Sequence, residues 1–122
     1  MSDLETKERL TNGQCVPCEG GAPKLTLDQA TTFHRATPDW SLRDDATAIS
    51  RKLNCGDFVK AVAVIKAISE LAESEQHHPD LHLTGYRHLK IDLTTHAIGG
   101  LSENDFIVAA KIDQLVESRS SS

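Results

Sequence analysis

The stretch "CGDFVKAVAVIKAISELAESEQHHP", residues 55–79, decides how the rest of the chain is interpreted. Asp57 is a residue type that favours the N-cap of a helix, and apolar side chains recur at helical spacing after it. Pro79 ends this helix, because it lacks a backbone N–H and biases His78 towards an extended conformation. The expected apolar stripe of the long helix consists of Phe58, Ala61, Val62, Ile65, Ile68 and Ala72.

A strand and another helix are predicted after it. In "YRHLKIDLTT", residues 86–95, apolar and polar residues alternate, which is typical of a strand with one covered and one polar face. Gly99 and Gly100 predict a turn, and "SEND" follows with the spacing of a capping box, Ser102 at the N-cap and Asp105 three residues later. The strand should bury Leu89, Ile91 and Leu93, and the last helix should bury Phe106, Ala109, Ile112 and Val116.

The residues before the long helix predict a short helix and a hairpin. In "LTLDQATTFHRA", residues 25–36, Thr26 and Gln29 have the spacing of a capping box. "TPDWSL" and "DATAISRKLN", residues 37–42 and 45–54, are two short extended pieces joined by a polar turn. The order of helix, two strands, helix, strand and helix indicates a two-layer α+β fold with helices on one face of an antiparallel sheet.

Length and composition predict a single domain. A chain of 122 residues can bury a real core without disulfides or metal. Residues 1–24 contain several glycines and prolines but few large apolar residues, so we expect a partly flexible arm of local turns there. The domain itself is expected over residues 25–117, followed by a disordered tail over residues 118–122.

Charge and cysteine content argue against several classes of protein. The net charge is −5 and no basic cluster is present, which argues against a nucleic-acid or membrane-surface partner. No apolar run is long enough for a membrane span, and "MSDLETKERL" lacks the apolar core of a secretory signal. Three cysteines cannot form a closed disulfide framework, so we expect a reducing, cytoplasmic location.

Histidines gather at the ends of two predicted elements. His77 and His78 follow the long helix and His96 follows the central strand, in loops of the kind that carry chemistry on a rigid scaffold. Because imidazole titrates at about pH 6.5, two of these rings could act as base and acid at neutral pH. The alternative interpretation is that His77 and His78 only fill a loop and that His82 and His88 are exposed to solvent.

Metal sites are less favoured by the residue spacing. The three histidines with a water would suit catalytic zinc, but an adjacent pair is not the i, i+4 pair of a helical zinc motif. Cys15 and Cys18 form a single CxxC pair, which could be half of a zinc site completed by another chain or by His34. Asp105 is expected first to complete a helix cap, and to serve catalysis only if the helix start abuts the histidines.

The stretch "HHPDLHLTGYRHLKIDLTTHAIGGLSENDFIVAAKID", residues 77–113, closely resembles pterin-4a-carbinolamine dehydratases. The shared features are the HHP triplet, the tyrosine that opens the strand, the T-H that closes it, and the G-L-[ST]-x-x-D helix start. The likeness extends more loosely back through the long helix to "WSL", residues 40–42, and covers about residues 25–117. "CVPC" followed by "EGGAPKLT" resembles the N-terminal extension of the plant and protozoan branch.

The resemblance implies a β-β-α-β-β-α fold with a leading helix and a four-stranded antiparallel sheet. "PDLHLT", residues 79–84, would then supply a strand that the pattern alone does not predict. The implied activity removes water from 4a-hydroxytetrahydropterin, the product of aromatic amino acid hydroxylases, to give quinonoid dihydropterin without cofactor or metal. Relatives assemble through sheet edges and helix faces, so we expect a homodimer or homotetramer.

The same resemblance assigns the site residues. His77 and His96 are the acid–base candidates, and His78, counted with them as catalytic, positions the pterin. Asp105 matches the helix-start aspartate of the family and is expected to orient a histidine. The expected substrate-binding residues are Gln76, His77, His78, Pro79, Thr94, Thr95, His96 and Asp105.

Two departures from the family pattern lie beside the histidine pair. "DLHLTG", residues 80–85, is one residue longer than in the animal form, and Gln76 stands where an acidic residue is common, which leaves Glu75 as the nearest carboxylate.

Two other functions stay open. One is a protein-binding module, since animal members also stabilise dimers of a homeodomain transcription factor, and the other is a pterin-binding role in molybdenum-cofactor metabolism.

Overall fold

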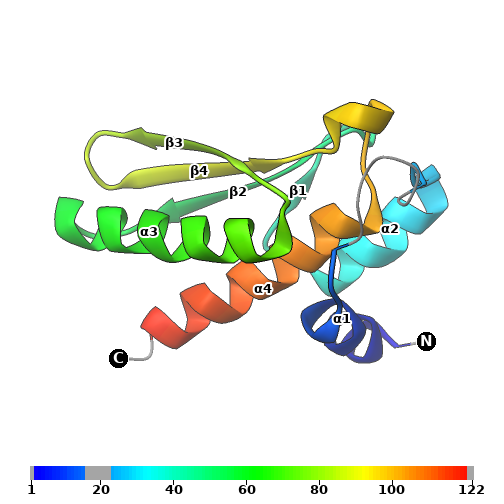
Figure 1. The fold of residues 1–122 in the computed structure, drawn as a ribbon, viewed down its shortest axis with the longest axis horizontal. Coiled ribbons are helices and arrows are strands. Elements are labelled where there is room, and N and C mark those ends of the chain that lie inside the picture. Colours follow the sequence, from blue (N-terminus) through cyan, green and yellow to red (C-terminus); the bar gives the residue numbers. More distant parts are fainter. Residues whose placement is uncertain (1, 16–22, 121–122) are drawn as a thin grey trace.

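In the computed structural model, which describes residues 2–15 and 23–120, helices cover one face of a four-stranded sheet (Figure 1). Helices α3 and α4 run beneath the sheet, while α1 contacts both α2 and α4. This arrangement confirms the predicted α+β fold. The elements are α1 (Asp3–Asn12), α2 (Leu27–Ala36), β1 (Ser41–Leu42), β2 (Ile49–Asn54), α3 (Phe58–Glu75), β3 (Asp80–Thr84), β4 (His88–Leu93), the 3₁₀ turn η1 (His96–Ile98) and α4 (Glu103–Ser120).

The strands of the sheet lie in the order β1-β2-β4-β3, and every neighbouring pair is antiparallel. β1 and β2 form the predicted hairpin, and β3 is the strand that only the family resemblance predicted. Leu89, Ile91 and Leu93 of β4 are at most 1% exposed, as their alternation predicted. Asp80 pairs with Asp92, so the loop before β3 and the loop after β4 lie at the same end of the sheet.

The two helices α2 and α3 begin at the predicted caps. Thr26 and Gln29 form the capping box of α2. Asp57 accepts a hydrogen bond from the N–H of Lys60 at the start of α3. Such caps supply partners for N–H groups that a helix leaves unsatisfied, which is why these side chains could be read from the sequence.

The buried side of α3 differs in part from the expected stripe. Phe58 and Val62 are 55% and 47% exposed, so their predicted burial is wrong, and Val59 is 78% exposed. The first turns of α3 carry apolar side chains on nearly every side, so spacing alone could not decide which of them face the core. The side chains of this helix that are buried belong to Ala61, Ile68 and Ala72.

A buried polar contact joins the first hairpin to α4. The indole N–H of Trp40, a residue only 1% exposed, donates to Oδ1 of Asp113 at 2.8 Å. The guanidinium of Arg51 on β2 donates to the same carboxylate. Burial raises the pKa of Asp113 although both donors act against it. The contact therefore ties the sheet to α4 through directional bonds in addition to apolar packing.

Part of the segment that was expected to be an arm of local turns, residues 3–12, is instead helical. Asp3–Asn12 form helix α1, capped by the hydroxyl of Ser2, which accepts from the N–H of Glu5. Leu10 of this helix is fully buried in the core. A polar helix with one deeply buried leucine has little periodicity for a sequence reading to detect, and its stability comes from packing on α2 and α4.

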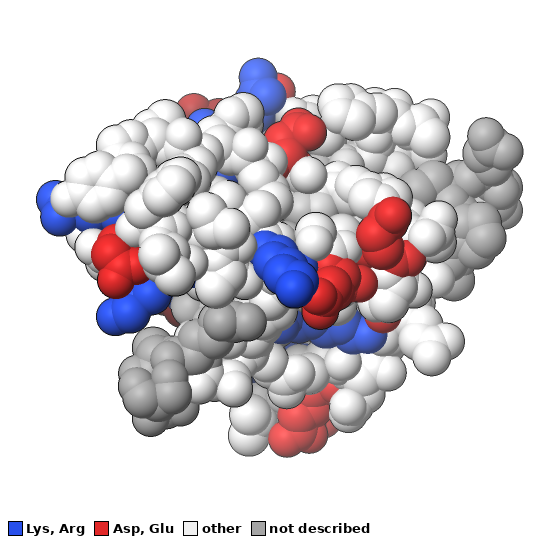
Figure 2. Space-filling view, turned by 60° about the vertical axis from the view of Figure 1, so that its left-hand side comes forward, with Lys and Arg blue, Asp and Glu red and all other residues white. Residues whose placement is uncertain are grey.

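Other expectations concerned the chain ends and the surface. α4 continues to Ser120, so the predicted disorder is wrong for residues 118–120. Cys18, one of the two cysteines of the predicted CxxC pair, lies outside the described residues. None of the described helices combines the length and the apolar character that a membrane span requires. On the face shown in Figure 2, lysine and arginine side chains lie among aspartates and glutamates and do not gather in one patch.

Candidate active site

The chain leaves α3 through a residue in the left-handed conformation. Gln76 has φ 53° and ψ 37°, and its N–H bonds to the carbonyls of Ala72 and Glu73. The N–H of His77 also reaches the Ala72 carbonyl, at 3.2 Å. This tight turn directs the side chain of His77 inward, where the residue is only 6% exposed.

The carboxylate of Asp105 receives three hydrogen bonds and is fully buried. Its Oδ1 lies 2.6 Å from Nε2 of His77, and its Oδ2 accepts from the Thr95 hydroxyl at 2.8 Å and from the Ser102 N–H at 2.9 Å. An ionised carboxylate can only accept, so the ring proton of His77 belongs on Nε2. Asp105 therefore does both things that the sequence allowed: it bonds the N–H of Ser102, the residue just before α4, and it holds a histidine ring.

Thr95 links this carboxylate to the third predicted histidine. The backbone of Thr95 pairs with Gly100 across a short bridge, and η1 begins at the next residue, His96. His96 is exposed. Because Asp105 bonds both His77 and Thr95, the two histidine segments meet at one end of the sheet. The structure thus brings together parts of the chain that the sequence could only propose as neighbours.

His78 bonds to a second carboxylate. Its Nε2 lies 2.6 Å from Oε2 of Glu73, and both side chains are exposed. Sequence reasoning missed Glu73, although a carboxylate in the last turn of a helix is well placed to meet the chain that leaves it. A cavity of about 300 Å³ adjoins the pair, and its lining includes Ile68, Ala72, Glu73, His78, Pro79 and Leu81.

Two other predicted binding residues, Gln76 and Thr94, form hydrogen bonds within the protein. The side-chain N–H of Gln76 donates to the Glu73 carbonyl at 2.6 Å, and the Thr94 hydroxyl donates to the Thr47 carbonyl at 2.6 Å. Pro79 lines the cavity beside His78. Ligand contacts for these residues stay predictions, and only Pro79 among them borders that cavity.

The two adjacent imidazoles therefore bond to different carboxylates, Asp105 and Glu73. Within residues 2–15 and 23–120, no three His, Cys, Asp or Glu side chains are placed to share a metal ion. The arrangement consists of one buried, oriented imidazole and two exposed ones near the same end of the sheet. Imidazole is the side chain type most often used for general acid–base chemistry.

Comparison with known proteins points in the same direction. The family described as "Pterin 4 alpha carbinolamine dehydratase" matches residues 23–115. A Methylococcus capsulatus protein, provisionally named pterin-4-alpha-carbinolamine dehydratase, is 42% identical over 106 residues, which is 87% of this chain and 92% of the relative. The Arabidopsis thaliana protein named pterin-4-alpha-carbinolamine dehydratase 2, mitochondrial, is 40% identical over 118 residues, which is 94% of this chain and 60% of the relative.

A solved structure agrees with these sequence relatives. The crystal structure of a transcriptional coactivator/pterin dehydratase from Brucella melitensis matches with a TM-score of 0.70 and 28% identity, over 76% of this chain and 98% of that chain. The family match and these relatives define an enzyme of the hydro-lyase class. The chain belongs to the pterin-4a-carbinolamine dehydratase family.

Proposed function

We propose that this enzyme dehydrates pterin-4a-carbinolamine, 4a-hydroxytetrahydrobiopterin, to quinonoid dihydropterin by histidine general acid–base catalysis. Family membership supports the overall reaction. The observation that supports this mechanism is the buried His77–Asp105 pair, in which a 2.6 Å contact orients an imidazole next to His78 and near the segment that carries His96. The reaction needs no cofactor or metal, because both of its demanding steps are proton transfers.

The dehydration breaks the C4a–O bond and forms a C=N bond within the pterin ring. The hydroxyl must gain a proton to leave as water, and a ring nitrogen must lose a proton as the C=N bond forms. No electrons pass to or from a co-reactant, so one acid and one base complete the reaction. Imidazoles can fill both roles near neutral pH.

Each histidine has a role in this scheme. His77 is the base: with its Nε2 proton held by Asp105, the other ring nitrogen carries the free electron pair. His96 is the acid at the start of η1, where it can meet the leaving hydroxyl. His78, bonded to Glu73 at the edge of the 300 Å³ cavity, positions the pterin.

The physiological setting follows from the substrate. Such an enzyme would return the spent cofactor of aromatic amino acid hydroxylases to the tetrahydrobiopterin cycle in the cytoplasm. It would act as a homodimer or homotetramer, because Phe58, Val59 and Val62 expose apolar surface along one helix. Surface of this kind on a globular protein often marks a contact with another chain.

A non-catalytic protein-binding function is the second candidate. The Brucella melitensis structure is described as a transcriptional coactivator as well as a pterin dehydratase. The same exposed apolar side chains of α3 would offer the contact surface. The two candidates differ in what they demand of His77, because a binding module works without an oriented imidazole.

Stopped-flow dehydration of synthetic carbinolamine, with and without a chelator, tests the proposed function. The wild type should accelerate the reaction equally in both conditions, and His77→Ala or His96→Ala should lower the rate about 10²- to 10⁴-fold. His82→Ala is the matched control, because this ring also faces a carboxylate, Asp92 at 3.1 Å, yet lies outside the site. Equal losses for His77 and His82 would refute the assigned roles, and full activity of His77→Ala would favour the binding function.

A further inference from the structure

Glu75 carries a largely buried carboxylate two residues before His77. Its side chain is 11% exposed, and Oε2 lies 2.7 Å from the ammonium of Lys111, itself 19% exposed. Its Oε1 accepts a hydrogen bond from the backbone N–H of Cys15 at 2.9 Å. Three segments far apart in the sequence thus meet at one carboxylate, next to the residue that turns the chain towards the site.

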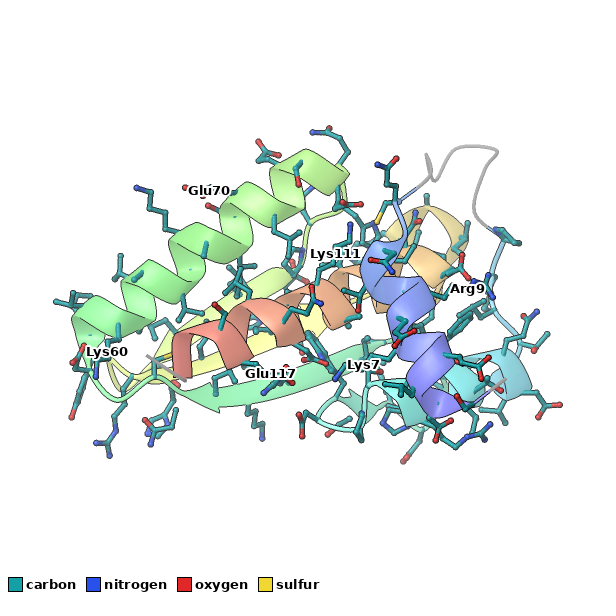
Figure 3. The ribbon with its side chains drawn as sticks, turned by 90° about the horizontal axis from the view of Figure 1, so that it is seen from below. Lys7, Arg9, Lys60, Glu70, Lys111 and Glu117 are labelled. Carbon is teal, nitrogen blue, oxygen red and sulfur yellow. The ribbon has the colours of Figure 1, made fainter. Side chains whose placement is uncertain are left out.

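Cys15 also contacts the residue next to Asp105, the carboxylate that bonds His77. Its thiol lies 3.7 Å from the carbonyl of Asn104, the residue before Asp105. Lys111 follows Asp105 on α4 and lies between the end of α3 and α1 in the view of Figure 3. The contacts of Cys15 and Lys111 therefore hold Glu75, two residues before His77, and Cys15 also contacts Asn104, the residue before Asp105.

The energetics of this cluster argue that it does more than stabilise the fold. Replacing a buried ion pair by apolar residues of similar volume is often neutral or stabilising, so such a pair is poorly explained by stability alone. A carboxylate in the last turn of a helix also faces the negative end of the helix dipole. Burial works to raise the pKa of Glu75, but the hydrogen bonds from Lys111 and Cys15 outweigh it and lower the pKa overall.

We propose that Glu75, Lys111 and the backbone of Cys15 form a positioning assembly for His77, an inference that rests on the proposed function of that histidine. Glu75 is the last residue of α3, and only Gln76 separates it from His77. Anchoring its carboxylate fixes the final turn of the helix, from which the left-handed turn at Gln76 delivers the imidazole to Asp105. Glu75 and Lys111 are positioning residues and need no contact with the substrate.

Glu75→Gln tests this assembly, because it keeps the side-chain shape and an acceptor but removes the charge that Lys111 binds. We expect kcat to fall about 10- to 100-fold with KM little changed, since displacement of a reacting group by about 1 Å can cost that much. Glu70→Gln is the matched control, because Glu70 is exposed on the same helix (Figure 3) and should leave kcat unchanged. Lys111→Met should repeat the loss, and Lys111→Arg should restore most of the rate.

Two further readouts separate positioning from a merely structural role. The Glu75→Gln effect on kcat should vanish in a His77→Ala background, because nothing is left to position. The NMR signal of the His77 Nε2 proton should move in Glu75→Gln but not in Glu70→Gln. An unchanged proton signal, a kcat within twofold of wild type, or the same loss with and without His77 would overturn the assembly. If the wild type does not dehydrate the carbinolamine, the proposed function fails, but the NMR comparison still decides whether Glu75 positions His77. If Glu75→Gln does not fold, Lys111→Met is used for the NMR comparison instead.

Discussion

Replacing Asp105 by asparagine should reverse the tautomer of His77. Oδ2 of Asp105 accepts from the Ser102 N–H and the Thr95 hydroxyl, and a backbone N–H cannot become an acceptor. The asparagine must therefore keep its carbonyl oxygen on that side and turn its NH₂ group towards His77. Nε2 of His77 then has to accept, so the ring proton moves to the other nitrogen.

The expected effect on catalysis is much larger than the effect on folding. The variant keeps two of the three hydrogen bonds and exchanges the charge-assisted contact of 2.6 Å for a neutral one, which should lower the free energy of unfolding by about 1.5 kcal/mol. Catalysis loses the base in its working tautomer, so kcat should fall about 10²- to 10⁴-fold.

Stopped-flow kinetics on the folded variant, with thermal denaturation as the companion measurement, would check both values. Asp92→Asn is the matched control, because it changes the same atoms beside an exposed histidine, His82, outside the site. It should leave kcat within about twofold of wild type. If Asp105→Asn kept more than a third of the wild-type kcat while His77→Ala lost a hundredfold, the tautomer argument would be refuted.

Three further predictions concern stability, reactivity and assembly. Trp40→Phe removes the indole donor to Asp113 and some buried volume, so urea denaturation should show a loss of about 2 kcal/mol with unchanged kcat; an unchanged midpoint would contradict the role given to this contact. Burial, reinforced by Glu75, raises the pKa of the Cys15 thiol to about 12, and because only the thiolate reacts, iodoacetamide should modify Cys15 slowly at about pH 8 and about tenfold faster per pH unit above it. Rapid modification at about pH 8, measured by mass spectrometry, would contradict the burial and the raised pKa of the Cys15 thiol. Val59→Glu, at a side chain 78% exposed, should dissociate the proposed homo-oligomer, as measured by light scattering; a wild type that is already monomeric would refute the proposed contact through α3.

The parts of the fold that could be predicted have local signals. The alternation of β4 and the cap of α3 at Asp57 depend on neighbouring residues only, and both are present as predicted. β3 has two alternating leucines in a polar stretch, too little for a pattern, and it was predicted only through family resemblance. Helix α1 was missed because its stability lies in contacts with α2 and α4 that no local spacing reveals.

The candidate site divides along the same line. A capping aspartate can be recognised from its spacing, but whether the other carboxylate oxygen of Asp105 meets His77 depends on how α4 docks against the end of α3. Glu73 and Glu75 could not be distinguished from ordinary helix-surface carboxylates, since their partners His78 and Lys111 are set by the chain path after the helix. Motif resemblance supplied the histidines and Asp105, whereas only the tertiary structure showed that Glu73 bonds His78.

The histidine pair stands between two backbone restraints. Before the pair, Gln76 adopts the left-handed backbone conformation, which costs a non-glycine residue free energy. After it, Pro79 restricts the backbone conformations that are open to His78. Most of the ordering entropy of this loop is therefore lost when the chain folds, before any ligand arrives. Association with a flat heterocycle then has little loop entropy left to overcome, so affinity at this position should depend mainly on contacts and desolvation.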